Sequence, residues 1–148
     1  MNLQRLATLE DIPALCGLLK ILFEQEEEFC FEQNKQENAL KTLLGSLHLG
    51  DILVTEISGK IIGMVTILYT FSTALNERVG LLEDMIIDPK YQNSGLGSKL
   101  IEYAFAFARL QGLKRITLLT DGTNKKAHRF YEKNNLTLSS MVPFRKIL

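Results

Sequence analysis

The spacing of apolar residues predicts two helices and three strands in the first half of the chain. Leucine and isoleucine recur every three or four positions in two segments, which is the period of a helix with one buried face. Three other segments are rich in β-branched and aromatic residues, which is typical of strands. The predicted elements, in chain order, are a strand at 3–7, a helix that begins at Thr8 and continues to about Leu22, a helix at 35–49 stopped by Gly50, and strands at 51–57 and 60–71 joined by the turn Ser58-Gly59.

The second half of the chain alternates strands with helices. Its predicted elements are a strand at 79–88, a helix at 95–111, a strand at 115–120, a helix at 124–133 and a closing strand from Leu136 toward Ile147. A run of strands followed by strand–helix alternation predicts a mixed sheet with helices on both faces. We therefore expect one α/β domain over residues 1–148.

The composition is that of an ordinary folded protein without a dominant charge. Of 148 residues, 46% are hydrophobic, and 17 basic side chains balance 17 acidic ones. Such a chain has no positive field to attract nucleic acid. The first residues lack a basic segment followed by an apolar run, and no stretch approaches the roughly 18 apolar residues of a membrane helix. We expect a cytoplasmic protein with neither nucleic acid nor membrane as a partner.

The cysteines and histidines do not predict a metal site. The two cysteines, Cys16 and Cys30, lie far apart in segments with no second cysteine pair, and the two histidines, His48 and His128, have no metal-ligand spacing. We therefore expect no bound metal.

A loop with two glycines leads from the strand at 79–88 into the helix at 95–111. Gly95 and Gly97 allow close approach of a ligand, and the first N–H groups of a helix have no intrahelical acceptor. Together with the helix dipole, these groups suit a pyrophosphate. Leu100 is too large for the dinucleotide fingerprint, and the glycine spacing does not fit a P-loop. The alternative is a simple turn before a helix.

Two segments, in the same order, resemble the motifs of the GNAT superfamily of N-acetyltransferases. The first, Gln92-Asn93-Ser94-Gly95-Leu96-Gly97, is similar to the family's Gln/Arg-x-x-Gly-x-Gly/Ala. The second begins at Asn124 and contains Phe130-Tyr131, and it is similar to Asn-x-x-Ala-x-x-Phe-Tyr-x-x-x-Gly-Phe. Asn135-Leu136 replaces the final Gly-Phe, and Asn is the next best residue for a left-handed helix end. The resemblance covers about 61–136 and implies a largely antiparallel mixed sheet with a central splay.

The resemblance implies acetyl-CoA as the cosubstrate, with its acetyl group moved directly to an amine in a ternary complex. In such a fold, backbone groups of one strand pair with the pantetheine arm, and the glycine loop holds the pyrophosphate. The implied cofactor-binding residues are Met85, Ile86, Ile87, Gln92, Asn93, Ser94, Gly95, Leu96, Gly97, Ser98 and Asn124. The alternative function is a CoA-binding or sensor module without catalysis.

The second motif implies that Tyr131 donates a proton to the departing thiolate. Aminolysis of a thioester needs an acid for the sulfur and a base for the amine. The alternative for Tyr131 is packing beside Phe130.

Glu83 is the candidate for the amine's base. Strand alternation would place it on the face of Met85 and Ile87, an unfavourable place for a carboxylate unless it lines a cleft. The triplet Leu82-Glu83-Asp84 is also similar to a sequence in diamine acetyltransferases, where the glutamate deprotonates the substrate through water. The alternative for Glu83 is solvation at a strand edge.

An acidic run between the first two helices predicts the kind of acceptor. In the GNAT fold this region overhangs the acceptor cleft, and here it contains Glu24, Glu26, Glu27 and Glu28. We predict that Glu24, Glu27 and Glu28 attract a cationic acceptor, either a small-molecule amine or a protein amino group. The alternative is a solvated acidic face. Dimers are frequent in the family, so a homodimer is expected by analogy.

Overall fold

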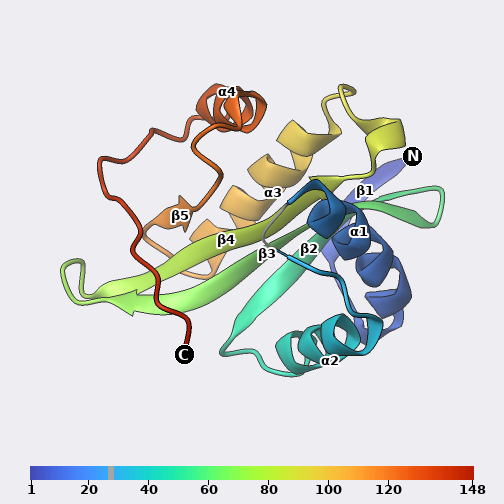
Figure 1. Cartoon of the computed structure of the whole chain (residues 1–148), viewed down its shortest axis with the longest axis horizontal. Coiled ribbons are helices and arrows are strands. Elements are labelled where there is room, and N and C mark those ends of the chain that lie inside the picture. Colours follow the sequence, from blue (N-terminus) through green and yellow to red (C-terminus); the bar gives the residue numbers. More distant parts are fainter. Residues whose placement is uncertain (27–28) are drawn as a thin grey trace.

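The computed structural model describes residues 1–26 and 29–148 and consists of one sheet with helices on both faces (Figure 1). The strands are β1 (Asn2–Leu6), β2 (Gly50–Ile57), β3 (Lys60–Ser72), β4 (Glu77–Ile87) and β5 (Ile116–Leu118). The helices are α1 (Ile12–Gln25), α2 (Gln33–Leu44), α3 (Leu96–Leu110) and α4 (Lys125–Lys133), with short 3-10 turns η1 (Leu9–Asp11) and η2 (Pro89–Tyr91). The strand order is β1-β2-β3-β4-β5, antiparallel except for the β4–β5 pair. The predicted mixed, largely antiparallel fold is confirmed.

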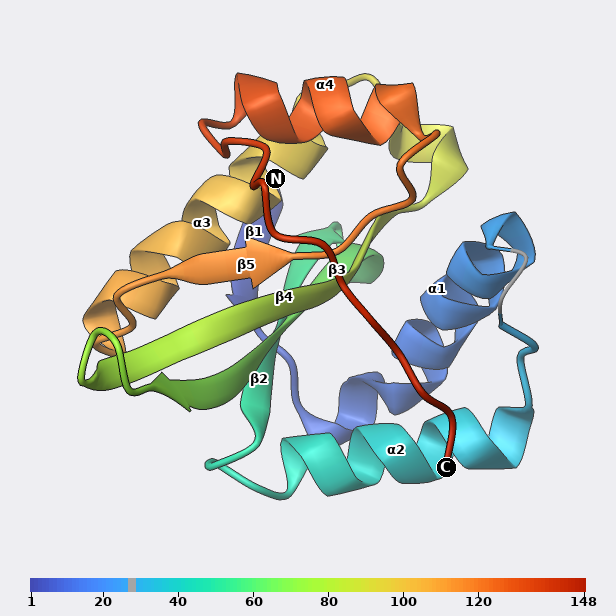
Figure 2. The ribbon, with the colours of Figure 1, turned by 60° about the vertical axis from the view of Figure 1, so that its left-hand side comes forward.

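Two hydrophobic cores lie on opposite faces of the sheet. Leu82 and Ile87 of β4 belong to the core beneath α3, whereas Met64 of β3 and Ile86 of β4 belong to the core beneath α1 and α2. Helix α4 lies on the α3 side, where Phe130 packs against the first core (Figure 2). The sheet thus separates a layer of α3 and α4 from a layer of α1 and α2.

The sheet splays between β4 and β5, as the resemblance implied. Residues Gly80–Leu82 of β4 pair in parallel with Ile116–Leu118 of β5, and the pairing stops there. Beyond that point, β4 runs on to Ile87 with no described strand on its β5 side. Backbone groups along this free stretch are therefore available to an extended ligand.

A β-bulge interrupts β4 at the splay. Two residues of β4, Asp84 and Met85, stand opposite Val65 of β3, because Glu83 pairs with Thr66 and the register then shifts by one. Asp84 has φ of 52°, in the left-handed region. An inserted residue of this kind bends a strand and changes where its side chains point.

The bulge also corrects the predicted placement of Glu83. Glu83 lies opposite Thr66, which shares its face with Met64 in the core beneath α1. Met85 and Ile87 instead pack against the core beneath α3. The prediction that Glu83 shares a face with Met85 and Ile87 is wrong, because alternation of side chains does not persist through an inserted residue.

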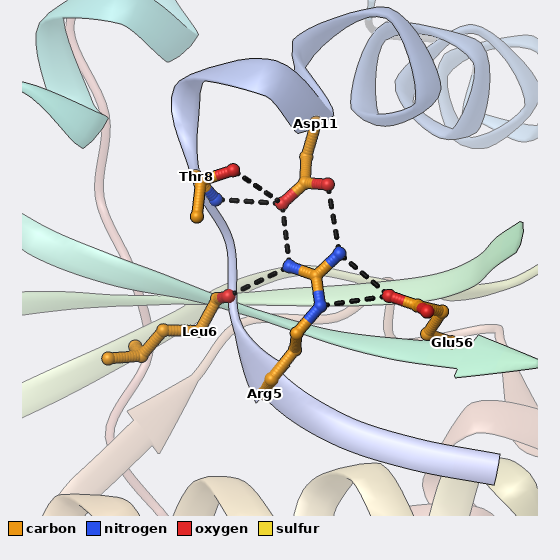
Figure 3. Close-up of polar contacts among 5 residues, drawn as sticks. All are labelled: Arg5, Leu6, Thr8, Asp11 and Glu56. Atoms are coloured by element: carbon orange, nitrogen blue, oxygen red, sulfur yellow. Dashed lines mark hydrogen bonds and ion pairs between the residues drawn. The ribbon is translucent and has the colours of Figure 1, made fainter. Parts of the chain in front are cut away.

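A charged network fixes the start of α1 to the sheet (Figure 3). The Asp11 carboxylate accepts hydrogen bonds from the Thr8 backbone N–H at 2.7 Å and from the two terminal nitrogens of Arg5 at 2.7 and 3.0 Å. Arg5 also donates to Glu56 on β2 at 2.9 Å. The hydrogen bond from Arg5 lowers the pKa of Asp11 below its usual value. The predicted helix start at Thr8 is confirmed, with the 3-10 turn η1 preceding α1.

Helix α2 ends earlier than predicted, and Gly50 does not stop it. The helix ends at Leu44, and Gly50 opens β2 instead. A Cβ added at Gly50 would lie only 2.2 Å from the Ile67 carbonyl oxygen of β3. Gly50 is therefore needed for close strand packing.

The predicted closing strand is absent, since no residue from Leu136 to Leu148 belongs to a strand. The chain turns after α4 at Asn135, whose φ of 68° is the left-handed conformation expected for this position. It then crosses the direction of β5 instead of running along it (Figure 2). The prediction is wrong because a strand also needs a backbone partner, which an apolar pattern does not supply.

Candidate active site

A cleft of about 630 Å³ opens at the splay, between the end of β4, the glycine loop and α4. All of the predicted cofactor-binding residues except Ser94 and Leu96 line it. Leu96 is instead buried in the core beneath α3. The full lining is Gln25, Met85, Ile86, Ile87, Gln92, Asn93, Gly95, Gly97, Ser98, Asn124, Lys126, Ala127, Phe130, Tyr131 and Lys133.

The glycine loop is shaped to place backbone N–H groups at the cleft. Gly95 is the N-cap of α3 with φ of 79°, a conformation that favours glycine. A Cβ at Gly97 would stand 3.2 Å from the Phe130 ring, so glycine also lets α3 and α4 approach. The Gln92 side-chain amide donates to the Ile87 carbonyl at 3.0 Å and ties the loop to β4. The first turn of α3 therefore presents backbone N–H groups without intrahelical acceptors beside the cleft.

Asn124 serves both α4 and the cleft. Its Oδ1 accepts a hydrogen bond from the Ala127 backbone N–H at 3.1 Å and so caps the helix. Because Oδ1 is engaged in this way, the amide NH₂ is the group that Asn124 can offer to a ligand.

Tyr131 projects from α4 into the same cleft and is half-buried. Burial, and secondly the charge of Glu26, raises the pKa of Tyr131 to about 12. The phenol therefore keeps its proton at neutral pH and can donate it. Its ring packs edge-on against Phe130, with centroids 5.3 Å apart. The packing alternative is thus present in the structure, and Tyr131 also lines the cleft.

Asp84, on the bulge of β4, carries a perturbed carboxylate. Burial, followed by the charges of Glu83 and Glu26, raises the pKa of Asp84 to about 6. The Thr66 hydroxyl lies close enough to Asp84 to favour the ionised carboxylate. Thr66 is fully buried, and its hydroxyl makes no hydrogen bond of good geometry. Asp84 therefore exchanges its proton near neutral pH, whereas Glu83 is exposed.

The acidic run is only partly described by the structure. Glu24 lies in the last turn of α1 and Glu26 follows the helix, and both are exposed. Glu26 is close enough to raise the pKa of both Asp84 and Tyr131. The predicted acceptor residues Glu27 and Glu28 lie outside the described residues.

Several lining residues were not predicted. Three of them, Lys126, Phe130 and Lys133, follow one another at four- and three-residue steps, so they share one face of α4. That spacing was visible in the sequence and could have revealed them. Gln25 could not be found in this way, because it reaches the cleft from the far end of α1.

The described part of the chain, residues 1–26 and 29–148, contains no cluster of three or more His, Cys, Asp or Glu side chains suited to a metal ion. Cys16 is buried, which raises its pKa, and Cys30 is exposed. In the same ranges, no helix has the length and apolar character needed to cross a membrane.

The comparison with known proteins places this fold in an acyl-transferring family. The model of the acetyltransferase (GNAT) family matches residues 15–135. The chain therefore belongs to the acetyltransferase (GNAT) family, and it is an acetyl-transferring enzyme. Enzymes of this family use acetyl-CoA as a cosubstrate.

Named relatives and a solved structure agree with this assignment. An uncharacterized N-acetyltransferase, YhfO, of Bacillus subtilis (strain 168) is 33% identical over 115 residues, 76% of this chain and 77% of the relative. The aminoalkylphosphonate N-acetyltransferase of Salmonella typhimurium is 26% identical over 128 residues, 86% of this chain and 79% of the relative. A possible acetyltransferase from Clostridium difficile 630 superposes with a TM-score of 0.91 at 17% identity, covering 100% of this chain and 98% of that chain. The match to the family and these names indicate acyl transfer to amines.

Proposed function

We propose that this enzyme transfers an acetyl group from acetyl-CoA to the primary amine of a cationic acceptor, by direct attack in a ternary complex. One observation carries the proposal. Glu26 lies close enough to Asp84 and Tyr131 for its charge to raise the pKa of both, and the charge of Glu83 also raises the pKa of Asp84. Negative charge of this kind attracts an ammonium group to the point of reaction.

The other end of the cleft has the features that acetyl-CoA requires. The first turn of α3, from Gly95 to Ser98, would hold the pyrophosphate, and Lys126 and Lys133 add positive charge at the cleft. The stretch Met85–Ile87 of β4, which has no described strand on its β5 side, would pair with the pantetheine amides. The amide group of Asn124 would donate to the same arm.

The residues supply the two proton transfers that aminolysis needs. A carboxylate takes a proton from the ammonium group, and the neutral nitrogen then attacks the thioester carbonyl. When the tetrahedral intermediate collapses, the carbon–sulfur bond breaks and Tyr131 gives its proton to the sulfur. The proton that remains on the acylated nitrogen passes to the tyrosinate. The carboxylic acid releases its proton to solvent, and the enzyme then returns to its starting state.

We place the amine's base on Asp84, next to the Glu83 that the sequence favoured. A base works best with a pKa near the working pH, and the half-buried Asp84 meets this condition. Glu83 then acts as a charge that raises the pKa of Asp84.

The pH dependence of kcat/KM should separate the two carboxylates. Because the base acts when ionised, kcat/KM of the parent should fall as the pH drops through about 6. Asp84→Asn should remove this acid limb and lower kcat/KM about a hundredfold at pH 8, the low end for a lost base. Glu83→Gln should keep the limb and move it to lower pH, because a neighbouring negative charge is gone. If Glu83→Gln abolishes the limb and Asp84→Asn leaves it, the base is Glu83.

A screen of amines with acetyl-CoA, monitored by release of free thiol, tests the function itself. We expect turnover with small cationic amines, and the aminoalkylphosphonate acceptor named for the Salmonella relative is a first compound to include. Replacing Glu26, Glu27 and Glu28 together by Gln should raise the acceptor KM at low salt and leave acetyl-CoA affinity unchanged. Saturable acetyl-CoA binding with no thiol release from any amine would favour the sensor module instead.

A further inference from the structure

Thr66 places a hydroxyl group in the middle of an apolar stretch of β3. It is 1% exposed, and its neighbours along the strand, Val65 and Ile67, are fully buried. Among the residues that the structure describes, the Thr66 hydroxyl has no hydrogen-bond partner. A buried hydroxyl without a partner costs free energy, and a valine would fill nearly the same space without that cost. This hydroxyl therefore calls for an explanation other than packing.

The group within reach of this hydroxyl is the carboxylate of Asp84. Thr66 lies opposite Glu83 of β4, and Asp84 is the next residue, inserted at the bulge. The hydroxyl is close enough to Asp84 to favour its ionised form, although the two groups are not aligned in the structure. A hydroxyl is a donor that rotates to suit its acceptor, so ionised Asp84 can supply the acceptor that Thr66 lacks.

The charged groups near Asp84 oppose its ionisation. Glu83 precedes it on β4 and Glu26 follows α1, and the negative charge of each raises the pKa of Asp84. Tyr131 of α4 lies near Glu26, and its phenol is neutral at the working pH. Of the groups that act on Asp84 within residues 1–26 and 29–148, Thr66 is the one that favours the charged form. Without it, Asp84 would be protonated at a higher pH.

We propose that Thr66 is a positioning residue for Asp84, and that its buried hydroxyl donates a hydrogen bond to the ionised carboxylate and holds it for proton abstraction. This inference rests on the proposed role of Asp84 as the amine's base. The hydroxyl binds one carboxylate oxygen and leaves the other to take the proton of the ammonium group. Thr66 keeps its own proton throughout. Because a hydrogen bond to a charged acceptor is stronger than one to a neutral acceptor, Thr66 favours the state in which Asp84 can act.

Thr66→Val tests this role through the pH dependence of kcat/KM. Valine keeps the branched shape and removes the hydroxyl, so the fold should persist and the pKa of Asp84 should rise. The acid limb should therefore move to higher pH by about one unit, because a hydrogen bond to a charged group is worth roughly that much. The shift is opposite in direction to the one expected for Glu83→Gln.

Two further variants separate positioning from packing. Thr66→Ser keeps the hydroxyl and loses a buried methyl group, so it should lower the thermal stability and leave the acid limb near its parental position. Thr55→Val is the matched control, because Thr55 is also fully buried and its hydroxyl has no described partner. Thr55 lies on β2 opposite Gly63, away from the bulge. Its substitution should not move the limb.

Carbon-13 NMR titration of the Asp84 carboxyl group, in the enzyme without substrates, measures the pKa of Asp84 independently of turnover. We expect a higher pKa in Thr66→Val than in the parent, Thr66→Ser and Thr55→Val. An unchanged Asp84 pKa in folded Thr66→Val would overturn the inference. A raised pKa with an unmoved acid limb of kcat/KM would support the hydrogen bond from Thr66 and overturn instead the assignment of Asp84 as the base.

Discussion

Tyr131→Phe is expected to slow single-turnover acetyl transfer by about a hundredfold, the lower end of the range for a lost general acid. The substitution removes one oxygen and keeps the ring, so the edge-on packing against Phe130 should persist. The lower end applies because a thiolate is a weak base and needs less help to leave than an alkoxide. Rapid-quench measurement with acetyl-CoA and a saturating amine reports the chemical step directly.

Tyr103→Phe gives a matched control for this experiment. Tyr103 lies on α3 and is partly buried against the core beneath that helix. It does not line the cleft. Its loss of a hydroxyl should leave the single-turnover rate near that of the parent. If folded Tyr131→Phe also reacts at the parental rate, with chemistry shown to be limiting, Tyr131 serves packing alone.

Gly95→Asp is expected to weaken acetyl-CoA binding about a hundredfold at low salt. Nothing lies within 4 Å of a Cβ built at Gly95, so a side chain fits, but it brings a negative charge to the first turn of α3. Two unit charges about 5 Å apart at a protein surface repel by roughly 3 kcal/mol, which corresponds to this loss of affinity. Calorimetry of acetyl-CoA binding measures it.

Gly95→Asn separates charge from backbone strain. Asn has the size of Asp and accepts the left-handed φ of 79° about as well, but it carries no charge. The dissociation constant of Gly95→Asn for acetyl-CoA should therefore lie within a few-fold of the parent's. Added salt should narrow the difference in affinity between the Asp and Asn variants. Equal dissociation constants for the Asp and Asn variants would place the pyrophosphate elsewhere. Gly97 is less suited to this test, because its substituent would also press on Phe130.

The cofactor end of the cleft could be predicted because it is built from local structure. The loop through Gly95 and Gly97 and the start of α3 are contiguous in the chain, and a helix start presents free N–H groups whatever surrounds it. The cap at Asn124 and the left-handed turn at Asn135 are local in the same way. Sequence alone therefore predicted the local elements around the loop, the family and most of the residues that line the cleft.

The acceptor end was decided by tertiary structure. The bulge at Asp84 arises from the register of β4 on β3, and it reversed the face expected for Met85. Glu26 comes close to Asp84 and Tyr131 only through the tertiary fold, in which α1 packs on the face of the sheet opposite α4. A pKa depends on burial and on charges distant in sequence, so no local pattern could have selected Asp84 over Glu83.

The segment after α4 also separates what the sequence determined from what the tertiary structure decided. Its apolar residues were readable from the sequence and predicted a strand, but a strand forms only where backbone groups find partners. The short β5 and the course of the chain after Asn135 left the segment without a partner strand among the described residues. Sequence by itself determined that segment 137–148 has apolar side chains to bury. Tertiary structure decided that they face outward, because hydrogen-bond pairing in a sheet is a relation between distant segments.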